Sequence, residues 1–264
     1  MIEPSTPVLV LHGLGERTWT LTLFLRFLAY IGFTNVHAPH WPANSCIMPG
    51  GCVMGLESSL AGMLNKSEPM IVIGNSMGGV LAYHLPQYGW NVQQAFYVAS
   101  PLNGSSMLRW VANAEAPESE RGSFWPRVAK EMVYAGPYEY LIKGHELAAP
   151  SHPYWTVTPR LDLAGIQSDG YVTVSDATLE NDRDVALHHS GHFALAMDPR
   201  AWIAIASRML PSGEIREKES GLSTMLLVQT YKALAPFFLA MPVLCAVLPA
   251  TCGLVYRFKH KQNP

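Results

Sequence analysis

The chain has 264 residues, which is enough for one sizeable α/β domain and short for two large ones. Apolar residues make up 49% of it, as in ordinary globular proteins, and charged residues only 14%. The net charge is -2 and the 18 lysines and arginines are scattered, whereas proteins that bind nucleic-acid phosphates cluster these residues. The composition therefore predicts a globular protein without a nucleic-acid partner.

The first third of the chain alternates between short apolar runs and longer helical patterns. The run at 7–13 predicts a buried strand that ends in a glycine turn, and residues 18–32 predict the helix that follows it. A short second strand is expected at 34–39, and a second helix at 55–66. The N-terminus lacks the charged and apolar regions of a secretory signal, so we expect none.

The same alternation continues through the middle of the chain. A strand is predicted at 69–75, a helix at 77–89 and another strand at 92–101. An insert follows at about 103–150, and then come two last strands at 162–169 and 183–190 and a closing helix at 199–210. Such alternation is typical of a mostly parallel sheet with helices on both faces. We therefore predict one α/β domain over residues 1–211, with the insert as a lid.

The C-terminal segment departs from the pattern of a soluble domain. Residues 233–256 carry no charge over a length that can span a bilayer, and a short basic tail follows at 257–264. Three prolines in this run would be costly in a soluble helix but are better tolerated in a transmembrane one. We predict a C-terminal membrane anchor behind a linker at 212–232, with the domain in the cytosol. A buried or domain-packing helix is the alternative.

The four cysteines form two pairs in the sequence. Cys46 and Cys52 lie in a loop rich in glycine and proline, and Cys245 and Cys252 lie in the C-terminal apolar run. The first pair could close a small disulfide loop, but a chain without a secretory signal is expected to keep its thiols reduced. We therefore predict free thiols at 46 and 52. No second ligand pair with suitable spacing accompanies them, so we expect no zinc site.

A candidate nucleophile stands in the middle of the chain. The stretch Gly74-Asn75-Ser76-Met77-Gly78 has the G-x-S-x-G form and lies between a predicted buried strand and a predicted helix. In such a turn the glycines leave room where side chains would clash, and the first amides of the helix point at the serine oxygen. The motif alone is common by chance, but this context is specific. Ser76 is the predicted nucleophile; a tight turn without chemistry is the alternative.

A nucleophilic serine needs a base and an acid that holds the base, and with this turn the acid precedes the base in the chain. Four aspartates stand near the ends of the last predicted strands, at positions 162, 169, 176 and 182. Asp169 follows the apolar run LAGI and lies in the turn QSDGYV, from which its side chain can reach a site. Asp162 precedes the run LAGI and so points to the opposite edge of the sheet, and Asp176 looks like a helix cap. We predict Asp169 as the acid, with Asp176 as its main rival.

The base is expected in the run HHSGHFALAMDP, which offers His188, His189 and His192. The first two finish a predicted strand, where one would point into packing and the other outward. His192 follows a Ser-Gly turn beyond the strand end, where a base can face the nucleophile. We predict His192 as the base.

The oxyanion of an acyl transition state needs backbone donors. The amide of Met77, directly after the nucleophile, is expected to supply one. The turn LHGLGER after the first strand should supply the other, with Leu14 as the donor and His12 as a brace of the loop. Glycine-rich turns also bind phosphates, but the chain has neither G-x-G-x-x-G nor a Walker lysine. We therefore expect no nucleotide, no other cofactor and no metal.

Taken together, these motifs resemble the α/β-hydrolase superfamily, and within it the small bacterial-type lipases and esterases. The resemblance spans roughly residues 7–210 and is carried by VLVLHGLG, VIGNSMGGVLAYHL, ASPLNGSS, SDGYVTVSDA and SGHFALAMDP. It implies Ser76 as the nucleophile, Asp169 as the acid and His192 as the base. The amides of Leu14 and Met77 would be the oxyanion donors. Many members have histidine before the nucleophile, where this chain has Asn75; that difference bears on substrate class rather than on catalysis.

The resulting prediction is a membrane-anchored serine hydrolase that cleaves carboxylic esters, of lipids in particular, through an acyl-enzyme. An anchor would hold the domain at a lipid surface. The aromatic residues of the insert could line an acyl pocket, or only fill the gap between insert and sheet. An acyltransferase with the same machinery is one alternative, and a non-catalytic binding module of the same fold is another.

Overall fold

The computed structural model describes residues 2–42, 46, 50–106, 140–141, 147–163 and 166–210. Most of the predicted insert lies outside these residues, as do the whole of the predicted linker, anchor and basic tail. In the described part of the chain, no helix combines the length and the apolar character needed to cross a bilayer. The lid and the anchor therefore stay predictions.

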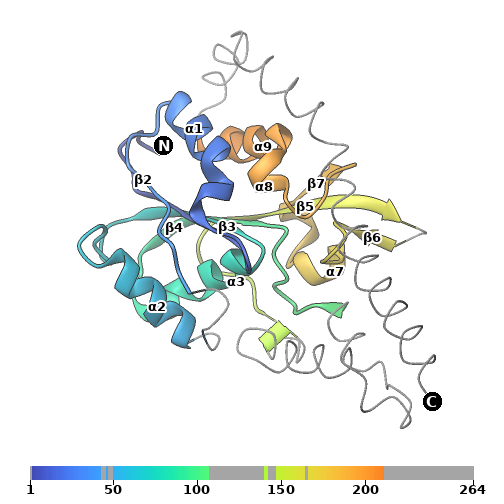
Figure 1. Ribbon diagram of the computed structural model, residues 1–264, viewed down its shortest axis with the longest axis horizontal. Helices are drawn as coiled ribbons and strands as arrows, with labels where there is room; N and C mark the ends of the chain where they lie inside the picture. Colours follow the sequence, from blue (N-terminus) through green and yellow to red (C-terminus); the bar gives the residue numbers. More distant parts are fainter. Residues whose placement is uncertain are drawn as a thin grey trace, which may run out of the picture.

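A seven-stranded sheet forms the centre of the described residues (Figure 1). Its strands are β1 (Val8–Leu11), β2 (Val36–His37), β3 (Met70–Asn75), β4 (Val92–Val98), β5 (Tyr154–Leu163), β6 (Ile166–Ser168) and β7 (Asp184–His188). They lie in the order β2-β1-β3-β4-β5-β6, and β7 pairs with β5. The pair β5–β6 is antiparallel and the other pairs of this sheet are parallel. This confirms the predicted α/β fold with a mostly parallel sheet.

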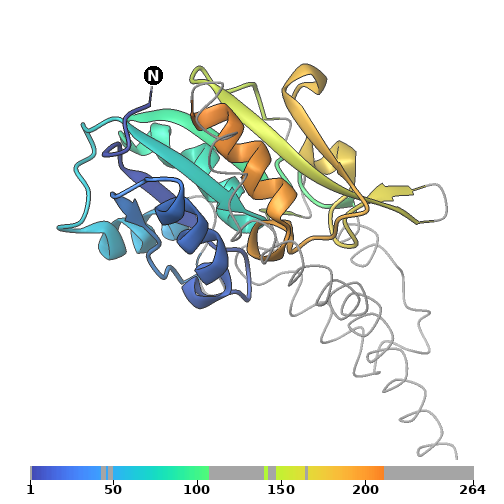
Figure 2. The same ribbon diagram turned by 90° about the horizontal axis from the view of Figure 1, so that it is seen from above.

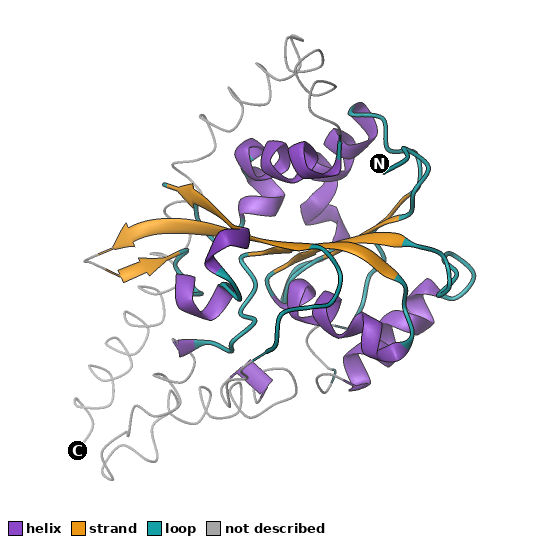
Figure 3. Ribbon diagram, turned by 180° about the vertical axis from the view of Figure 1, so that it is seen from behind, coloured by secondary structure: helices purple, strands orange, loops and turns teal. Residues whose placement is uncertain are grey.

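Helices cover both faces of the sheet and make three layers (Figure 3). Helices α1, α8 and α9 lie on one face and α2, α3 and α7 on the other, and α9 runs along the direction of the strands (Figure 2). The helices are α1 (Thr22–Tyr30), α2 (Gly50–Leu60), α3 (Met77–His84), α7 (Val174–Ala177), α8 (Ala194–Met197) and α9 (Pro199–Met209). Short 3-10 turns accompany them as η1 (Thr18–Leu21), η2 (Leu85–Tyr88) and η4 (Asn181–Arg183).

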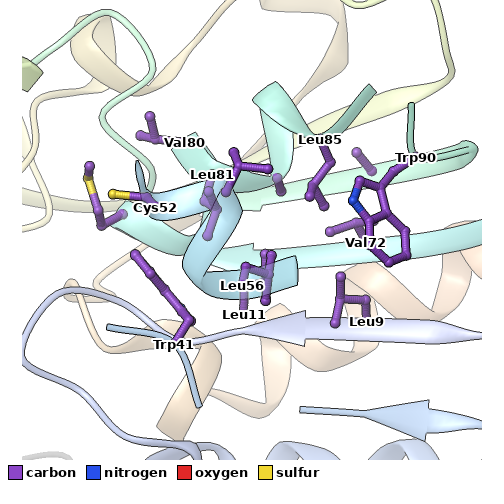
Figure 4. Close-up of a cluster of buried hydrophobic side chains, with 14 of the residues drawn as sticks. Leu9, Leu11, Trp41, Cys52, Leu56, Val72, Val80, Leu81, Leu85 and Trp90 are labelled. Carbon is purple, nitrogen blue, oxygen red and sulfur yellow. The ribbon is translucent and has the colours of Figure 1, made fainter. Parts of the chain in front are cut away.

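Two apolar clusters, one on each face of the sheet, hold the layers together. Leu9, Leu11 and Val72 belong to the cluster of α2 and α3 (Figure 4), whereas Val8 and Ile71 belong to that of α1 and α9. Successive strand residues point to opposite faces, and both faces are covered, so β1 and β3 are continuous apolar runs. Burying one such side chain contributes roughly 1.5–3 kcal/mol to folding.

The prediction of one strand over 162–169 was right only for its last part, where β6 lies, and wrong for its start. β5 instead begins at Tyr154 and ends at Leu163, and β6 returns antiparallel to it. Pro159 conceals this strand in the sequence, because a proline donates no ladder hydrogen bond. β4 stops pairing with β5 at Val157, and at Pro159 the register pairs β5 with β7. Pro159 therefore lies in the part of β5 that no longer pairs with β4.

Cys46 and Cys52 form a disulfide, so the prediction of two free thiols was wrong. α2 begins at Gly50 rather than at the predicted residue 55, which places Cys52 in its first turn. The two Cα atoms are 4.8 Å apart, within the range that a disulfide spans. Both cysteines are buried in the cluster of α2 and α3 (Figure 4). The second cysteine pair lies outside the described residues.

Candidate active site

The predicted nucleophile lies in a sharp turn between β3 and α3. Ser76 has φ 52° and ψ -122°, a backbone conformation that residues other than glycine seldom adopt. Its amide donates to the Val98 carbonyl on β4 at 2.8 Å, which ties the turn to the sheet. Close approach requires the glycines: a Cβ on Gly74 would stand 2.4 Å from the backbone of α3, and one on Gly78 would stand 2.5 Å from the Leu11 carbonyl oxygen.

Ser76, His192 and Asp169 form one hydrogen-bonded chain. Ser76 Oγ lies 2.8 Å from His192 Nε2, and His192 Nδ1 lies 2.7 Å from Asp169 Oδ2. Asp169 directly follows β6, and His192 lies in the loop between β7 and α8. The structure thus brings together the three side chains that the sequence predicted, although Ser76 and His192 are 116 residues apart.

The backbone of its own turn holds the Asp169 carboxylate. Oδ1 accepts from the amides of Tyr171 and Val172, at 2.8 and 2.7 Å, which leaves Oδ2 for His192. The His192 amide donates to the Asp169 carbonyl at 3.0 Å, and both residues are buried. A carboxylate only accepts, so His192 Nδ1 carries the proton and Nε2 is left to accept one from Ser76.

Burial lowers the pKa of His192, because a buried imidazolium loses its hydration. The charge of Asp169 and its hydrogen bond raise the pKa, and the charge of Glu16 raises it further. These charges outweigh burial, and the pKa of His192 lies above its usual 6.5. The surroundings of His192 therefore favour its protonated form.

The amides of Leu14 and Met77 lie on two turns that meet at Ser76. Met77 is the first residue of α3, and neither its amide nor that of Leu14 has an acceptor among the described residues. The Leu14 turn packs directly against the serine, since a Cβ on Gly13 would stand 3.0 Å from Ser76 Cβ. The two turns that carry these amides thus meet at Ser76, which agrees with the predicted pair of oxyanion donors.

His12 braces the Leu14 turn, as predicted. Its Nδ1 lies 2.9 Å from the Gly13 carbonyl oxygen, and its Nε2 lies 3.2 Å from His40 Nδ1. The ring stacks on Trp41, whose Nε1 donates to the His12 carbonyl at 3.2 Å. Burial lowers the pKa of His12 from its usual 6.5, so the ring is neutral near pH 7 and brings no charge to the turn.

The rival candidates have other places in the fold. Asp176 accepts from the amide and the hydroxyl of Ser106, at 2.9 and 2.7 Å, and so ties α7 to the start of the predicted insert. Thr173, rather than Asp176, caps α7. His188 and His189 are both exposed, so the prediction that one of them packs inward was wrong. A positive φ of 58° at His189 ends the regular alternation of the strand at this point.

The sequence prediction missed Glu16. Its carboxylate accepts from the Gly13 amide at 2.6 Å, and from Asn75 Nδ2 at 3.0 and 3.2 Å. The available signals were an acid three residues after Gly13 and an amide just before the nucleophile. Neither signal indicates that these side chains meet, because Glu16 and Asn75 are 59 residues apart.

The chemistry available at this site is that of a serine, an imidazole, a carboxylate and backbone amides. Among the residues that the structure describes, no group of three or more His, Cys, Asp or Glu side chains could hold a metal ion. A serine and an imidazole in this arrangement can transfer an acyl group through a covalent intermediate.

Solved structures of other proteins share this fold. The mature form of lipase BlEst2 from Bacillus licheniformis has a TM-score of 0.54 and 12% identity, over 80% of this chain and 95% of that one. Methylketone synthase I from tomato, complexed with 2-tridecanone, has a TM-score of 0.50 and 13% identity, over 78% of this chain and 99% of that one. At these identities the likeness concerns the fold alone. No curated protein sequence matches the chain.

The sequence profile of the alpha/beta hydrolase family matches residues 8–227, which is well over half of the chain. The matched stretch contains the Leu14 turn, the strained turn at Ser76, and both Asp169 and His192. The sheet order and the helices on both of its faces agree with this match. The chain therefore belongs to the alpha/beta hydrolase family.

Proposed function

We propose that this chain is a membrane-anchored serine hydrolase that cleaves carboxylic esters of lipids through an acyl-enzyme. The observation that carries the proposal is the pair of hydrogen bonds that runs from Ser76 through His192 to Asp169. A hydroxyl, an imidazole and a buried carboxylate in this order activate the hydroxyl for attack on a carbonyl carbon.

In the first half-reaction Ser76 Oγ attacks the acyl carbonyl, and His192 Nε2 takes the serine proton. Asp169 holds the ring by its Nδ1–H and stabilises the imidazolium that forms. The amides of Leu14 and Met77 bind the oxyanion of the tetrahedral intermediate. His192 then protonates the leaving alcohol, and the acyl group stays on Ser76.

In the second half-reaction a water molecule attacks the acyl-enzyme, with His192 again as the base. The same two amides bind the second oxyanion, and Ser76 leaves with a proton from His192. The raised pKa of His192 suits both transfers, because the ring must hold a proton in each intermediate. The cycle uses only groups that this chain supplies, together with water.

Support for lipid substrates comes from the predicted anchor and the predicted lid. An anchor at 233–256 would keep the site at a bilayer surface. The Ser105 amide donates to the Leu141 carbonyl at 2.8 Å, so these two residues of the predicted insert lie side by side. His84 Nε2 lies 2.8 Å from the Tyr140 hydroxyl, so the same part of the insert also contacts α3. These contacts are compatible with the proposed lid over residues 103–150.

The test is labelling of the full chain in detergent with a fluorophosphonate, together with turnover of p-nitrophenyl esters. Wild type is expected to label and turn over. Ser76→Ala and His192→Ala should each lose turnover by about 10⁴-fold or more, and Ser76→Ala should not label. Ser207→Ala removes an exposed hydroxyl on α9 and serves as the matched control. A folded wild-type chain that neither labels nor turns over contradicts the proposal.

The same assay distinguishes substrate classes. Faster turnover of long than of short acyl chains supports a lipid esterase, whereas a preference for short chains points to soluble esters. An added alcohol acceptor separates hydrolysis from transfer, because an acyltransferase would form the new ester in preference to the free acid.

A further inference from the structure

The two amides assigned to the oxyanion belong to segments that are far apart in the sequence. Leu14 lies on the turn after β1, and Met77 lies on the turn after β3. β1 and β3 are neighbours in the sheet, but the pairing between them ends at Leu11 and Gly74. Beyond that pair the ladder between the two strands no longer fixes the distance between the amides.

A single carboxylate connects the two turns. Glu16 Oε2 accepts from the Gly13 amide at 2.6 Å and so closes the turn that carries Leu14. Both Glu16 oxygens accept from Asn75 Nδ2, at 3.0 and 3.2 Å. Gly13 directly precedes Leu14, and Asn75 lies two residues before Met77. Hydrogen bonds to an ionised acceptor are roughly twice as strong as neutral ones, so this bridge is a firm one.

Contact with Glu16 sets the orientation of the Asn75 amide. The Asn75 side chain is fully buried, and its Oδ1 has no hydrogen-bond partner among the described residues. A half-turn of the amide would bring Oδ1 against the Glu16 oxygens, where two acceptors would face each other. A buried oxygen without a hydrogen bond is unfavourable, so the Asn75 amide keeps this orientation because its NH₂ group gains the hydrogen bonds to Glu16.

Glu16 also lies close to the reacting groups. A Cβ on Gly13 would stand 3.0 Å from Ser76 Cβ and 3.1 Å from Glu16 Oε2, so Ser76 and the Glu16 carboxylate both lie next to Gly13. Burial and Asp169 have the larger effects on the pKa of His192, and the charge of Glu16 adds to the upward shift. Removal of the Glu16 charge should therefore lower the pKa of His192.

We propose that Glu16 is a positioning residue that holds the two oxyanion donors at a fixed separation, through the Gly13 amide and the Asn75 side chain. This rests on the proposed function, which gives the amides of Leu14 and Met77 a common task. In this role Glu16 acts on the two turns, through the Gly13 amide and the Asn75 side chain, and not on the ester itself. A displacement of about 1 Å in such donors lowers a rate by up to roughly 100-fold.

The test compares Glu16→Gln, Asn75→Asp and the double variant, each in the full chain. Glu16→Gln keeps an acceptor for Gly13 but removes the charge and turns an amide group toward the Asn75 donor. Asn75→Asp places two carboxylates face to face. The double exchange restores the bridge with reversed polarity, because the new amide at 16 can donate to the new carboxylate at 75 and still accept from Gly13.

We expect kcat to fall roughly 10- to 100-fold in Glu16→Gln and further in Asn75→Asp, with KM within about threefold of wild type. The double variant should recover about tenfold over Asn75→Asp. Inhibition by a trifluoromethyl ketone, which forms an oxyanion on Ser76, should weaken in parallel with kcat. The acid limb of kcat/KM should move to lower pH in Glu16→Gln, a change that a merely structural role would not produce.

Glu68→Gln makes the same chemical change at an exposed position before the start of β3 and should alter none of these quantities. Exhaustive fluorophosphonate labelling counts the folded sites in each preparation, so loss of folded protein is not mistaken for loss of rate. Glu16→Gln with kcat within about threefold of wild type and an unmoved acid limb overturns the proposal, as does a double variant that recovers nothing. A wild-type chain without turnover overturns the proposed function, and with it the task of Glu16.

Discussion

In the proposed mechanism His192 acts as a base, which requires a neutral ring, and this sets the pH dependence expected of the site. Burial lowers the pKa of His192, but the charges of Asp169 and Glu16 leave it above 6.5. Activity should therefore fall as the pH decreases through this raised value, which puts the acid limb of kcat/KM above 6.5. A profile of kcat/KM between about pH 5 and about pH 9 measures the limb. A limb below 6.5 would show that burial outweighs the two carboxylates.

Replacement of the acid by its amide tests how the imidazole is oriented. In Asp169→Asn the new amide can donate to His192 Nδ1, which favours the ring tautomer with its proton on Nε2. We expect kcat to fall by about 10⁴-fold with little change in fold. Asp176→Asn is the matched control, since that carboxylate binds Ser106 instead. A larger loss in Asp176→Asn than in Asp169→Asn would reverse the assignment of the acid.

The residues that come together at the site differ in how far the sequence could predict them. Ser76, Asp169 and His192 were predictable because the strand–turn–helix context and the chain order leave few positions for each. Glu16 was not, because its contact with Asn75 depends on two turns that meet only after β1 and β3 have paired. A pattern within one segment carries no information about such a meeting.

Among the elements, the disulfide between Cys46 and Cys52 fixes the start of α2 to the preceding loop. The cysteines are 6 residues apart, and closing so short a loop contributes roughly 2 kcal/mol through the unfolded chain. The double variant Cys46→Ala with Cys52→Ala is expected to lower Tm by roughly 4–8 °C in calorimetry. Reductant should lower Tm in wild type and leave the double variant unchanged. A reduced wild-type chain with an unchanged Tm would contradict this contribution.

The elements themselves were predictable where burial on two faces leaves an unbroken apolar run. β1, β3 and α3 lie where the sequence indicated, because their residues fill the clusters on both sides of the sheet. β5 was not predicted because Pro159 interrupts the strand pattern in the sequence. In the fold, this part of the chain is a strand because it pairs with β7. The start of α2 was missed because two glycines and a disulfide, rather than helix propensity, determine it.

For the whole molecule, the predicted anchor at 233–256 decides where the proposed reaction takes place. Leu244→Arg puts a charge near the middle of this run, at a cost of roughly 2.5–3.5 kcal/mol at the centre of a bilayer. Wild type should stay with membranes after a carbonate wash, and the variant should be extracted. Leu244→Ile is the uncharged control. Extraction of wild type would contradict the anchor and leave the chemistry at Ser76 untouched.

The site is divided between two halves of the chain, and this division has a consequence for synthesis. Ser76 and both oxyanion turns precede Val98, whereas Asp169 and His192 follow Tyr154. On the ribosome, the strands around Ser76 can pair while the acid and the base do not yet exist. The proposed set of Ser76, Asp169 and His192 is therefore incomplete until residue 192 of 264 has emerged. The proposed enzyme acquires its reactivity shortly before the segment predicted to bind it to a membrane is made.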